Sequence, residues 1–279
     1  MNRRSFIKGI AVLGGAGLLT GVYSWQIEPF WLEFVKVKMS IKNLPDHLIG
    51  KTIMQISDMH IGNRFDRQFI IDSFLEAKIY KPDFVVYTGD FISYESDEQF
   101  DQLKEVFNNA VYGKIGTVGI LGNHDYGRNW SQNYVAEIVV KTLTEKGIPI
   151  LRNEQLNING LNFIGLDDYW ATNFHPTIVM NELSGEQANI VLCHNPDVAD
   201  EPVWNNYKGW ILSGHTHGGQ VKPPFLDPPV LPVKNKNYSA GKYDLADGRT
   251  LYINRALGNL WQVRFNVRPE ITIFELETS

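Results

Sequence analysis

Alternating and continuous apolar segments predict most of the strands of this chain. Residues 35–41 are apolar at every odd position and Lys or Ser at every even position, which is typical of a half-buried strand. Later apolar runs have almost no polar interruption, as in strands covered on both faces. These runs are Thr52–Ile56, Phe84–Tyr87, Val118–Leu121, Ile190–Cys193 and the shorter Trp210–Leu212.

Helical and turn patterns fill the segments between the predicted strands. Apolar residues recur at three- and four-residue spacing in Phe69–Ile79, in Phe100–Ala110 and from about Ser131 to Lys146. Asn159-Gly160 and Asp247-Gly248 each separate two apolar segments, which predicts β-hairpins. Strands joined partly by helices and partly by hairpins indicate a mixed α/β sandwich, and no linker divides residues 33–279.

The N-terminus has the pattern of an export segment. A basic start, Met1–Lys8, precedes residues 9–25, which are uncharged and mostly apolar. Arg3-Arg4-Ser5-Phe6-Ile7-Lys8 resembles a twin-arginine signal, and a generic secretory signal or membrane anchor is the alternative. No A-x-A cleavage site is evident, and Trp25, Phe30, Trp31 and Phe34 suit a membrane interface.

We therefore expect residues 1–30 to be a twin-arginine-type signal or an N-terminal membrane anchor. The twin-arginine export machinery would then be a partner of the chain. The mature protein is expected to be exported, in the periplasm or at the outer face of the cytoplasmic membrane. If the segment stays uncleaved, the N-terminus would also hold the protein at the membrane.

Composition excludes several classes of site. The 279 residues include 26 Lys and Arg against 31 Asp and Glu, a formal net charge of −5, so nucleic acid is not a favoured partner. Cys193 is the single cysteine, which excludes an internal disulfide framework and a cysteine-rich metal site.

Polar residues of the metal-ligand type directly follow each of the five apolar runs. The clusters are Ser57–His60, Thr88–Asp90, Gly122–Asp125, His194–Pro196 and Ser213–His217. Because ligands gather at the carboxyl ends of strands in α/β sheets, we expect these clusters to form one site. Their nitrogen and oxygen donors suit Mn²⁺, Fe or Zn²⁺, and there are more of them than one Zn²⁺ needs, which indicates two ions.

The order of these motifs resembles the calcineurin-like metallophosphoesterase superfamily. D-x-H, G-D, G-N-H-D, a lone His and G-H-x-H follow one another from Asp58 to His217. The segments around His194, His217 and Arg264 resemble a narrower group of bacterial exported or membrane-anchored phosphodiesterases with a twin-arginine signal. The resemblance implies that residues 31–279 form a four-layer α/β/β/α sandwich, with the metal site at the carboxyl ends of the strands.

The resemblance also implies a role for each motif residue. One ion would be bound by Asp58, His60, Asp90 and His217. The second would be bound by Asp90, as a bridge, with Asn123, His194 and His215. His124 would lie near the scissile phosphate as a catalytic proton or hydrogen-bond donor, and Asp125 would fix its orientation. Mn²⁺ is the expected ion, with Fe or Zn as alternatives. The two ions would generate a bridging hydroxide that attacks phosphorus in line.

Three functions remain open at this point. The first is a dinuclear phosphoesterase, above all a phosphodiesterase, acting on a small-molecule or lipid phosphate ester. The second is a membrane-tethered hydrolase of the pyrophosphate in a UDP-diacylglucosamine-like lipid precursor. The third is a non-catalytic binding module on the same fold, although every motif residue is present.

Two further segments have a structural and a functional interpretation. Asp167-Asp168 suits a turn beside the core or an additional carboxylate site. The proline-rich loop Pro223–Pro232 directly follows the last metal motif, so we expect it near the rim of the site. It is either a stiff loop packed on the domain or a surface for an acyl chain or membrane.

Overall fold

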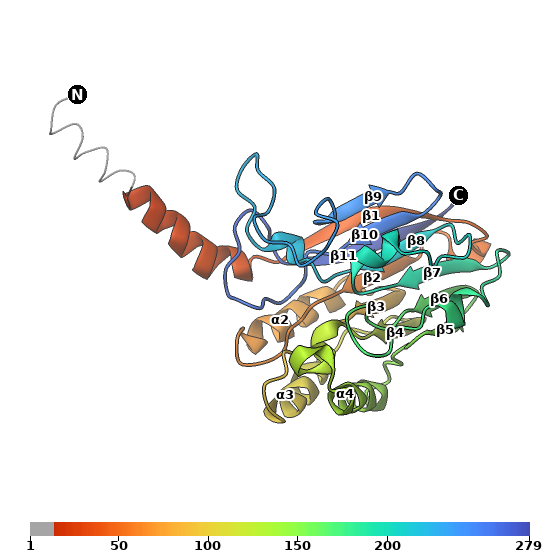
Figure 1. Cartoon of the computed structure of the whole chain (residues 1–279), viewed down its shortest axis with the longest axis horizontal. Helices are drawn as coiled ribbons and strands as arrows, with labels where there is room; N and C mark the ends of the chain where they lie inside the picture. The colour runs from red at the N-terminus through yellow and green to blue at the C-terminus, as the bar shows by residue number, and fades with distance from the viewer. Residues whose placement is uncertain (1–13) are drawn as a thin grey trace.

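The computed structural model describes residues 14–279. Residues 14–22 form a helix that projects from the body of the molecule, followed by η1 (Tyr23–Ile27) and η2 (Glu28–Phe30) (Figure 1). Within residues 14–279, no helix combines the length and the hydrophobicity that crossing a bilayer requires. The arginine pair of the predicted signal lies outside the described residues.

The first sheet contains both ends of the folded chain. Its strand order is β1 (Glu33–Ile41), β11 (Glu270–Thr278), β2 (Thr52–Ile56), β3 (Phe84–Thr88) and β4 (Gly116–Ile120). β2, β3 and β4 are parallel to one another, whereas β11 runs antiparallel to β2 and parallel to β1. The last strand of the chain therefore inserts between the first two.

The second sheet combines parallel strands with the two predicted hairpins. Its order is β5 (Glu154–Ile158), β6 (Leu161–Gly165), β7 (Ala188–Leu192), β8 (Trp210–Ser213), β10 (Thr250–Ile253) and β9 (Gly241–Asp244). β5 and β6 pair antiparallel around Asn159-Gly160, and β9 and β10 do so around Asp247-Gly248. β6, β7, β8 and β10 are parallel.

Helices and a central core arrange these sheets in layers. Ile53 and Phe84 of the first sheet pack with Ile190 and Leu212 of the second, so a buried core lies between the sheets. The residues that alternate with these along the strands of the first sheet point away from the second sheet. They pack against three helices, which lie together in Figure 1. These are α2 (Arg67–Lys78), α3 (Glu98–Phe107) and α4 (Asn133–Glu145).

The outer face of the second sheet has a thinner cover. Val191 and Ile211 of that face pack against Met180 of the one-turn helix α5 (Thr177–Met180) and Val198 of η6 (Pro196–Asp200). The layers follow the expected α/β/β/α order, and loops supply much of the fourth layer. Strands β2, β3, β4, β7 and β8 each end where a ligand cluster begins.

Candidate metal centre

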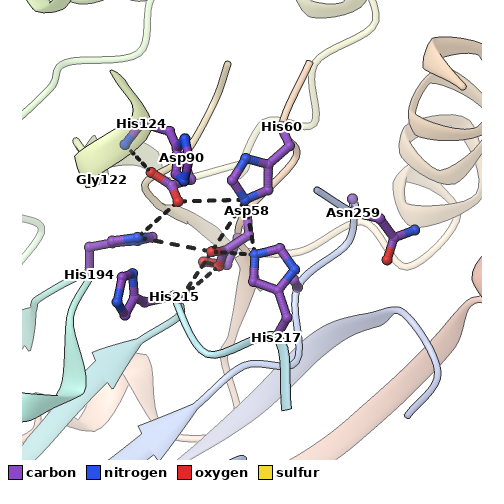
Figure 2. Close-up of polar contacts among 12 residues, drawn as sticks. Asp58, His60, Asp90, Gly122, His124, His194, His215, His217 and Asn259 are labelled. Atoms are coloured by element: carbon purple, nitrogen blue, oxygen red, sulfur yellow. Dashed lines mark hydrogen bonds and ion pairs between the residues drawn. The ribbon is translucent and has the colours of Figure 1, made fainter. Parts of the chain in front are cut away.

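The five polar clusters meet at the carboxyl ends of both sheets. Figure 2 shows Asp58, Asp90 and three of the imidazoles pointing toward one another. Their side chains are buried or nearly so, although they come from segments up to 159 residues apart in sequence. Side chains that the sequence spreads over five strands therefore form one compact cluster.

Asp58, His60 and His217 form the first group of donors. The Nε2 atom of His217 lies 3.3 Å from Asp58 Oδ1, and His60 Nε2 lies 4.0 Å from the same oxygen. The two Nε2 atoms are 2.9 Å apart. Three potential ligand atoms within 4.8 Å of one another can hold one metal ion.

Asp90, His194 and His215 form the second group, by the same criterion. The Nε2 atom of His194 lies 3.2 Å from Asp90 Oδ2. The same oxygen lies 3.5 Å from His60 Nε2, in the first group. Asp90 is thus the carboxylate between the two groups, where a bridging ligand would have to be.

Buried polar atoms without partners show that the cluster fits metal ions. Asn123 is 1% exposed, and neither its amide oxygen nor its amide nitrogen has a hydrogen-bond partner. His217 Nδ1 is buried and also lacks one. Since an unpartnered buried polar atom costs about 1–3 kcal/mol, donors left in this state indicate a missing ligand.

Hydrogen bonds at the far side of three imidazoles fix which nitrogen faces the site. His194 Nδ1 lies 2.8 Å from the Thr88 carbonyl oxygen, and His215 Nε2 lies 2.8 Å from that of Pro232. A carbonyl only accepts, so each of these nitrogens carries the proton and the other offers its lone pair. His60 Nδ1 lies 3.0 Å from the Ser93 hydroxyl, which leaves Nε2 toward the cluster.

His124 lies at the edge of the cluster. Its ring packs edge-to-face on His60, with ring centroids 4.9 Å apart, and its backbone N–H donates to Asp90 Oδ1 at 2.8 Å. The ring also forms a donor group with His60 and Asp90. The geometry therefore permits a metal-ligand role for His124 as well as the proton-donor role that the resemblance implies.

Asp125 is held by the backbone rather than by the His124 ring. Its carboxylate accepts hydrogen bonds from the N–H groups of Phe91, Ile92 and Gly122, at 2.8 to 3.1 Å. These bonds tie the loop after β3 to the turn after β4. Any effect of Asp125 on the orientation of His124 therefore passes through the backbone of η4 (Asn123–Tyr126).

The backbone at the site adopts conformations that side chains normally disfavour. Asp58, His60, Asp90, His215 and His217 all have φ between 48° and 70°. Each such residue costs on the order of 1–2 kcal/mol relative to a right-handed conformation. This strain gathers on five of the seven predicted ligands, which is typical of a functional site.

Close backbone approach explains two of the glycines in the motifs. A Cβ at Gly122 would lie 2.3 Å from Asp90 Oδ1, and a Cβ at Gly214 would lie 2.1 Å from Asp58 Oδ2. Either contact would displace a carboxylate of the cluster. Glycine is therefore required where these turns pass the site.

Charges within the cluster partly neutralise one another. Burial opposes ionisation of Asp58, but His194 and His217 outweigh it and lower the Asp58 pKa to about 2. Burial also disfavours the charged form of His194, which lowers its pKa, but the carboxylates of Asp90 and Asp58 raise this pKa well above its usual value. Because metal ions bind unprotonated imidazole, an ion at His194 must displace a proton held by these carboxylates.

Burial and a neighbouring imidazole have the opposite effect on His215. Burial and the His194 charge lower its pKa to about 3, so His215 is neutral at physiological pH. The pKa of His124 is also lowered, first by burial. Both rings therefore have a free lone pair near pH 7.

A cleft that the motifs did not predict opens beside His124. Its lining includes Arg64, Arg128, Trp130 and Leu260. Arg64 Nε donates at 2.8 Å to the carboxylate of Glu95, which also lines the cleft. Charged and apolar side chains therefore stand together next to the predicted catalytic residue.

A buried arginine supports the segment between β10 and β11. Arg264 is fully buried and donates to the carbonyl oxygens of Gly258, Ala256, Arg255 and Val267. The Gly258 N–H in turn donates to the Asp58 carbonyl at 2.8 Å. One function of the Arg264 segment is thus to hold the backbone beside a metal-site carboxylate.

Two further buried groups, Asp168 and Cys193, lie next to the centre. Asp168 Oδ1 accepts hydrogen bonds from the N–H groups of Trp170 and Ala171, as in a turn, while its Oδ2 is buried without a partner. Burial raises the Asp168 pKa to about 7. Burial also raises the pKa of the Cys193 thiol, which is inconsistent with a thiolate nucleophile.

Comparison with known proteins defines the class. The family model of calcineurin-like phosphoesterases matches residues 51–219, which contain every predicted ligand. Because this match covers more than half of the chain, the protein belongs to that family. It is therefore an enzyme of the class that hydrolyses phosphoester bonds, and the non-catalytic module left open by the sequence is not supported.

Several relatives match over nearly their whole length. The chain is 31% identical to the uncharacterized metallophosphoesterase YkuE of Bacillus subtilis, over 100% of this chain and 99% of the relative. It is 29% identical to the phosphodiesterase YaeI of Escherichia coli, over 99% of each. The UDP-2,3-diacylglucosamine pyrophosphatase LpxG of Chlamydia trachomatis is 25% identical, over 92% of this chain and 93% of the relative.

Proposed function

We propose that the protein is a dinuclear, metal-dependent phosphodiesterase. The observation that supports this most directly is the position of Asp90 Oδ2, 3.2 Å from His194 Nε2 and 3.5 Å from His60 Nε2. One carboxylate oxygen between two sets of imidazoles suits two ions that share a ligand. Mn²⁺ is our first choice, with Fe or Zn as alternatives for this donor set.

The proposal gives each donor a role. Asp58, His60 and His217 would hold one ion, and Asn123, His194 and His215 the other, with Asp90 between them. When bound, the ions would act as Lewis acids toward phosphate oxygens and lower the pKa of water. Asn123 adds a neutral oxygen, which limits the negative charge facing an anionic substrate.

His124 and the adjoining cleft would act on the substrate itself. His124 would donate a proton or hydrogen bond to the departing oxygen, since it lies at the edge of both donor groups. A diester carries a second substituent, and the cleft lined by Arg128, Trp130 and Leu260 offers a place for one. This room beside the site favours a diester over a monoester.

A second candidate is hydrolysis of a pyrophosphate in a lipid precursor. It is favoured by the similarity to proteins named UDP-2,3-diacylglucosamine pyrophosphatase. Arg128 in the cleft could pair with a second phosphate group. The phosphodiesterase remains our first proposal because the relative YaeI, which bears that name, is the more similar.

A substrate comparison separates these candidates. Protein stripped of metal and reloaded with Mn²⁺ would be given bis(p-nitrophenyl) phosphate, p-nitrophenyl phosphate and a UDP-linked diacyl lipid. Faster turnover of the diester than of the other two supports the phosphodiesterase. Preference for the lipid pyrophosphate supports the second candidate, and preference for the monoester contradicts both.

We also propose that the protein is exported by the twin-arginine route and acts at the outer face of the cytoplasmic membrane or in the periplasm. The support is the Arg3-Arg4-Ser5-Phe6-Ile7-Lys8 sequence. Arg3→Lys combined with Arg4→Lys should leave the protein in the cytoplasm, whereas Lys36→Arg should not affect export. Undiminished export of the double variant would contradict this route.

A further inference from the structure

Large apolar side chains are exposed on three neighbouring segments at one end of the molecule. The loop of residues 221–232 has a fully exposed Phe225 with exposed Leu226 and Val230, and residues 258–265 include Trp261, which is 71% exposed. The N-terminal segment adds Trp25. We call these five side chains the apolar rim; they are Trp25, Phe225, Leu226, Val230 and Trp261.

Hydrogen bonds connect the three segments of the apolar rim. Gln262 donates to the Trp25 carbonyl, and the Arg264 N–H donates to that of Ser24. The Gln220 amide donates to the carbonyls of Trp261 and Val263, both at 3.0 Å. The segments therefore form one surface, and Figure 1 shows the N-terminal helix beside the blue loops at that end.

The apolar rim borders the metal centre. The loop that exposes Phe225 ends at Pro232, whose carbonyl oxygen accepts from His215 Nε2 at 2.8 Å. The segment that exposes Trp261 begins at Gly258, which donates to the Asp58 carbonyl, and continues through Leu260 in the cleft. The loops that carry Phe225 and Trp261 are thus each anchored at a group that contacts a predicted metal ligand.

The N-terminal segment, which extends away from the apolar rim, indicates what the rim binds. Residues 9–27 contain no charged side chain, and residues 14–22 form a helix whose side chains are all exposed. An apolar helix with Leu18 and Leu19 in water is unfavourable, by about 25 cal/mol per Å² of apolar surface. A bilayer that covers this helix would also meet the rim at its base, where tryptophans suit the lipid headgroup level.

We propose that the apolar rim docks on a lipid bilayer and holds the metal centre at the level of the headgroups. Docking here would bring a phosphoester of an amphiphile to the cleft while its acyl chains stay in the membrane. That consequence rests on the proposed hydrolase function, whereas the docking itself does not.

A fluorescent probe on the rim tests the proposal without metal or substrate. Cys193 is buried, so Phe225→Cys introduces an exposed thiol that takes an environment-sensitive nitrobenzoxadiazole label. The matched control is Ile178→Cys, at an exposed apolar position on α5. With the full chain and vesicles of phosphatidylethanolamine and phosphatidylglycerol, the label at 225 should shift to the blue and the label at 178 should not.

Sedimentation with the same vesicles separates the rim from the N-terminal helix. Phe225→Ser, Leu226→Ser and Trp261→Ser combined should lower the vesicle affinity at least tenfold, while Ile79→Ser with Ile178→Ser should not change it. Equal binding by the rim variant, or a blue shift caused by self-association without vesicles, would overturn the proposal. If the wild-type protein binds the vesicles but hydrolyses no diester, the proposed function fails and the docking proposal stands.

Discussion

The Nε2 atoms of His60 and His217 lie 2.9 Å apart and face each other. Two imidazoles can meet in this way through one shared proton or with both lone pairs directed at a cation. Asp58 Oδ1 lies within 4.0 Å of both nitrogens. His60 and Asp90 link this pair to the second donor group, so we infer that the whole cluster is stabilised by metal ions.

Metal removal should therefore lower the stability of the fold. A ligand at 1,000 times its Kd stabilises the native state by about 4 kcal/mol, which corresponds to roughly 10 °C in Tm for a chain of this size. The strained backbone of the five ligands with positive φ adds to the need for a bound ion. Calorimetry with Mn²⁺ and then with excess chelator measures the difference, and equal Tm values would contradict the inference.

Asp90→Asn should remove most of both ions, because one oxygen of this carboxylate serves both donor groups. We expect metal content to fall from about two per chain to below one, with a loss of at least about 100-fold in diester hydrolysis. Asp101→Asn, at an exposed position on α3, is the matched control. Elemental analysis after gel filtration gives the metal content, and full retention of metal by Asp90→Asn would exclude a bridging role.

His124→Ala should reduce kcat without emptying the site. Loss of a general acid typically lowers kcat by about 100- to 10,000-fold, whereas the other donors would still hold the ions. His47→Ala is a suitable control, since His47 is exposed and bonds only to the Asn159 carbonyl among the described contacts. If His124→Ala loses metal in proportion to activity, His124 is a ligand rather than a proton donor.

The raised pKa of Asp168 predicts a pH-dependent stability. Its pKa is about 7 in the folded chain, above its usual value of 3.8, so the folded state favours the protonated form. The stability that the folded state gains from protonated Asp168 is complete below about pH 4 and is lost as the pH rises toward 7.

Asp168→Asn removes that titration while keeping an oxygen for the Trp170 and Ala171 N–H groups. The variant should therefore gain stability over the wild type between pH 5 and pH 8, by up to about 4 kcal/mol. Urea unfolding of metal-stripped protein at several pH values measures the gain. A difference that does not change with pH would contradict the buried, protonated state of Asp168.

The sequence predicted the ligand cluster because each member directly follows an apolar run. Asp58, Asp90 and Asn123 could be placed together from strand ends alone, since they follow three parallel strands that carry their carboxyl ends to one edge of the first sheet. The antiparallel hairpins were also readable, because Asn-Gly and Asp-Gly favour the turn they require. These features depend on local sequence, and the structure contains them at the expected positions.

Contacts between distant segments were not predictable in the same way. β11 has no local signal for its place between β1 and β2, which depends on pairing across more than 200 residues. The Pro232 carbonyl and the Ser93 hydroxyl orient ligands, but either residue type is common in any loop. The sequence predicts a signal or anchor over residues 1–30, and within this range Glu28 is buried and its carboxylate accepts a hydrogen bond from the Val267 N–H.

A metal titration of diester hydrolysis tests the central claim most directly. Stripped protein would receive Mn²⁺ in fractions of an equivalent, and the initial rate with bis(p-nitrophenyl) phosphate would be followed after each addition. If Asp90 bridges two ions, we expect no turnover without metal. The initial rate should then reach a plateau at about two equivalents of Mn²⁺ per chain. Full activity in stripped protein, or no activity at any metal content, would contradict a dinuclear phosphoesterase.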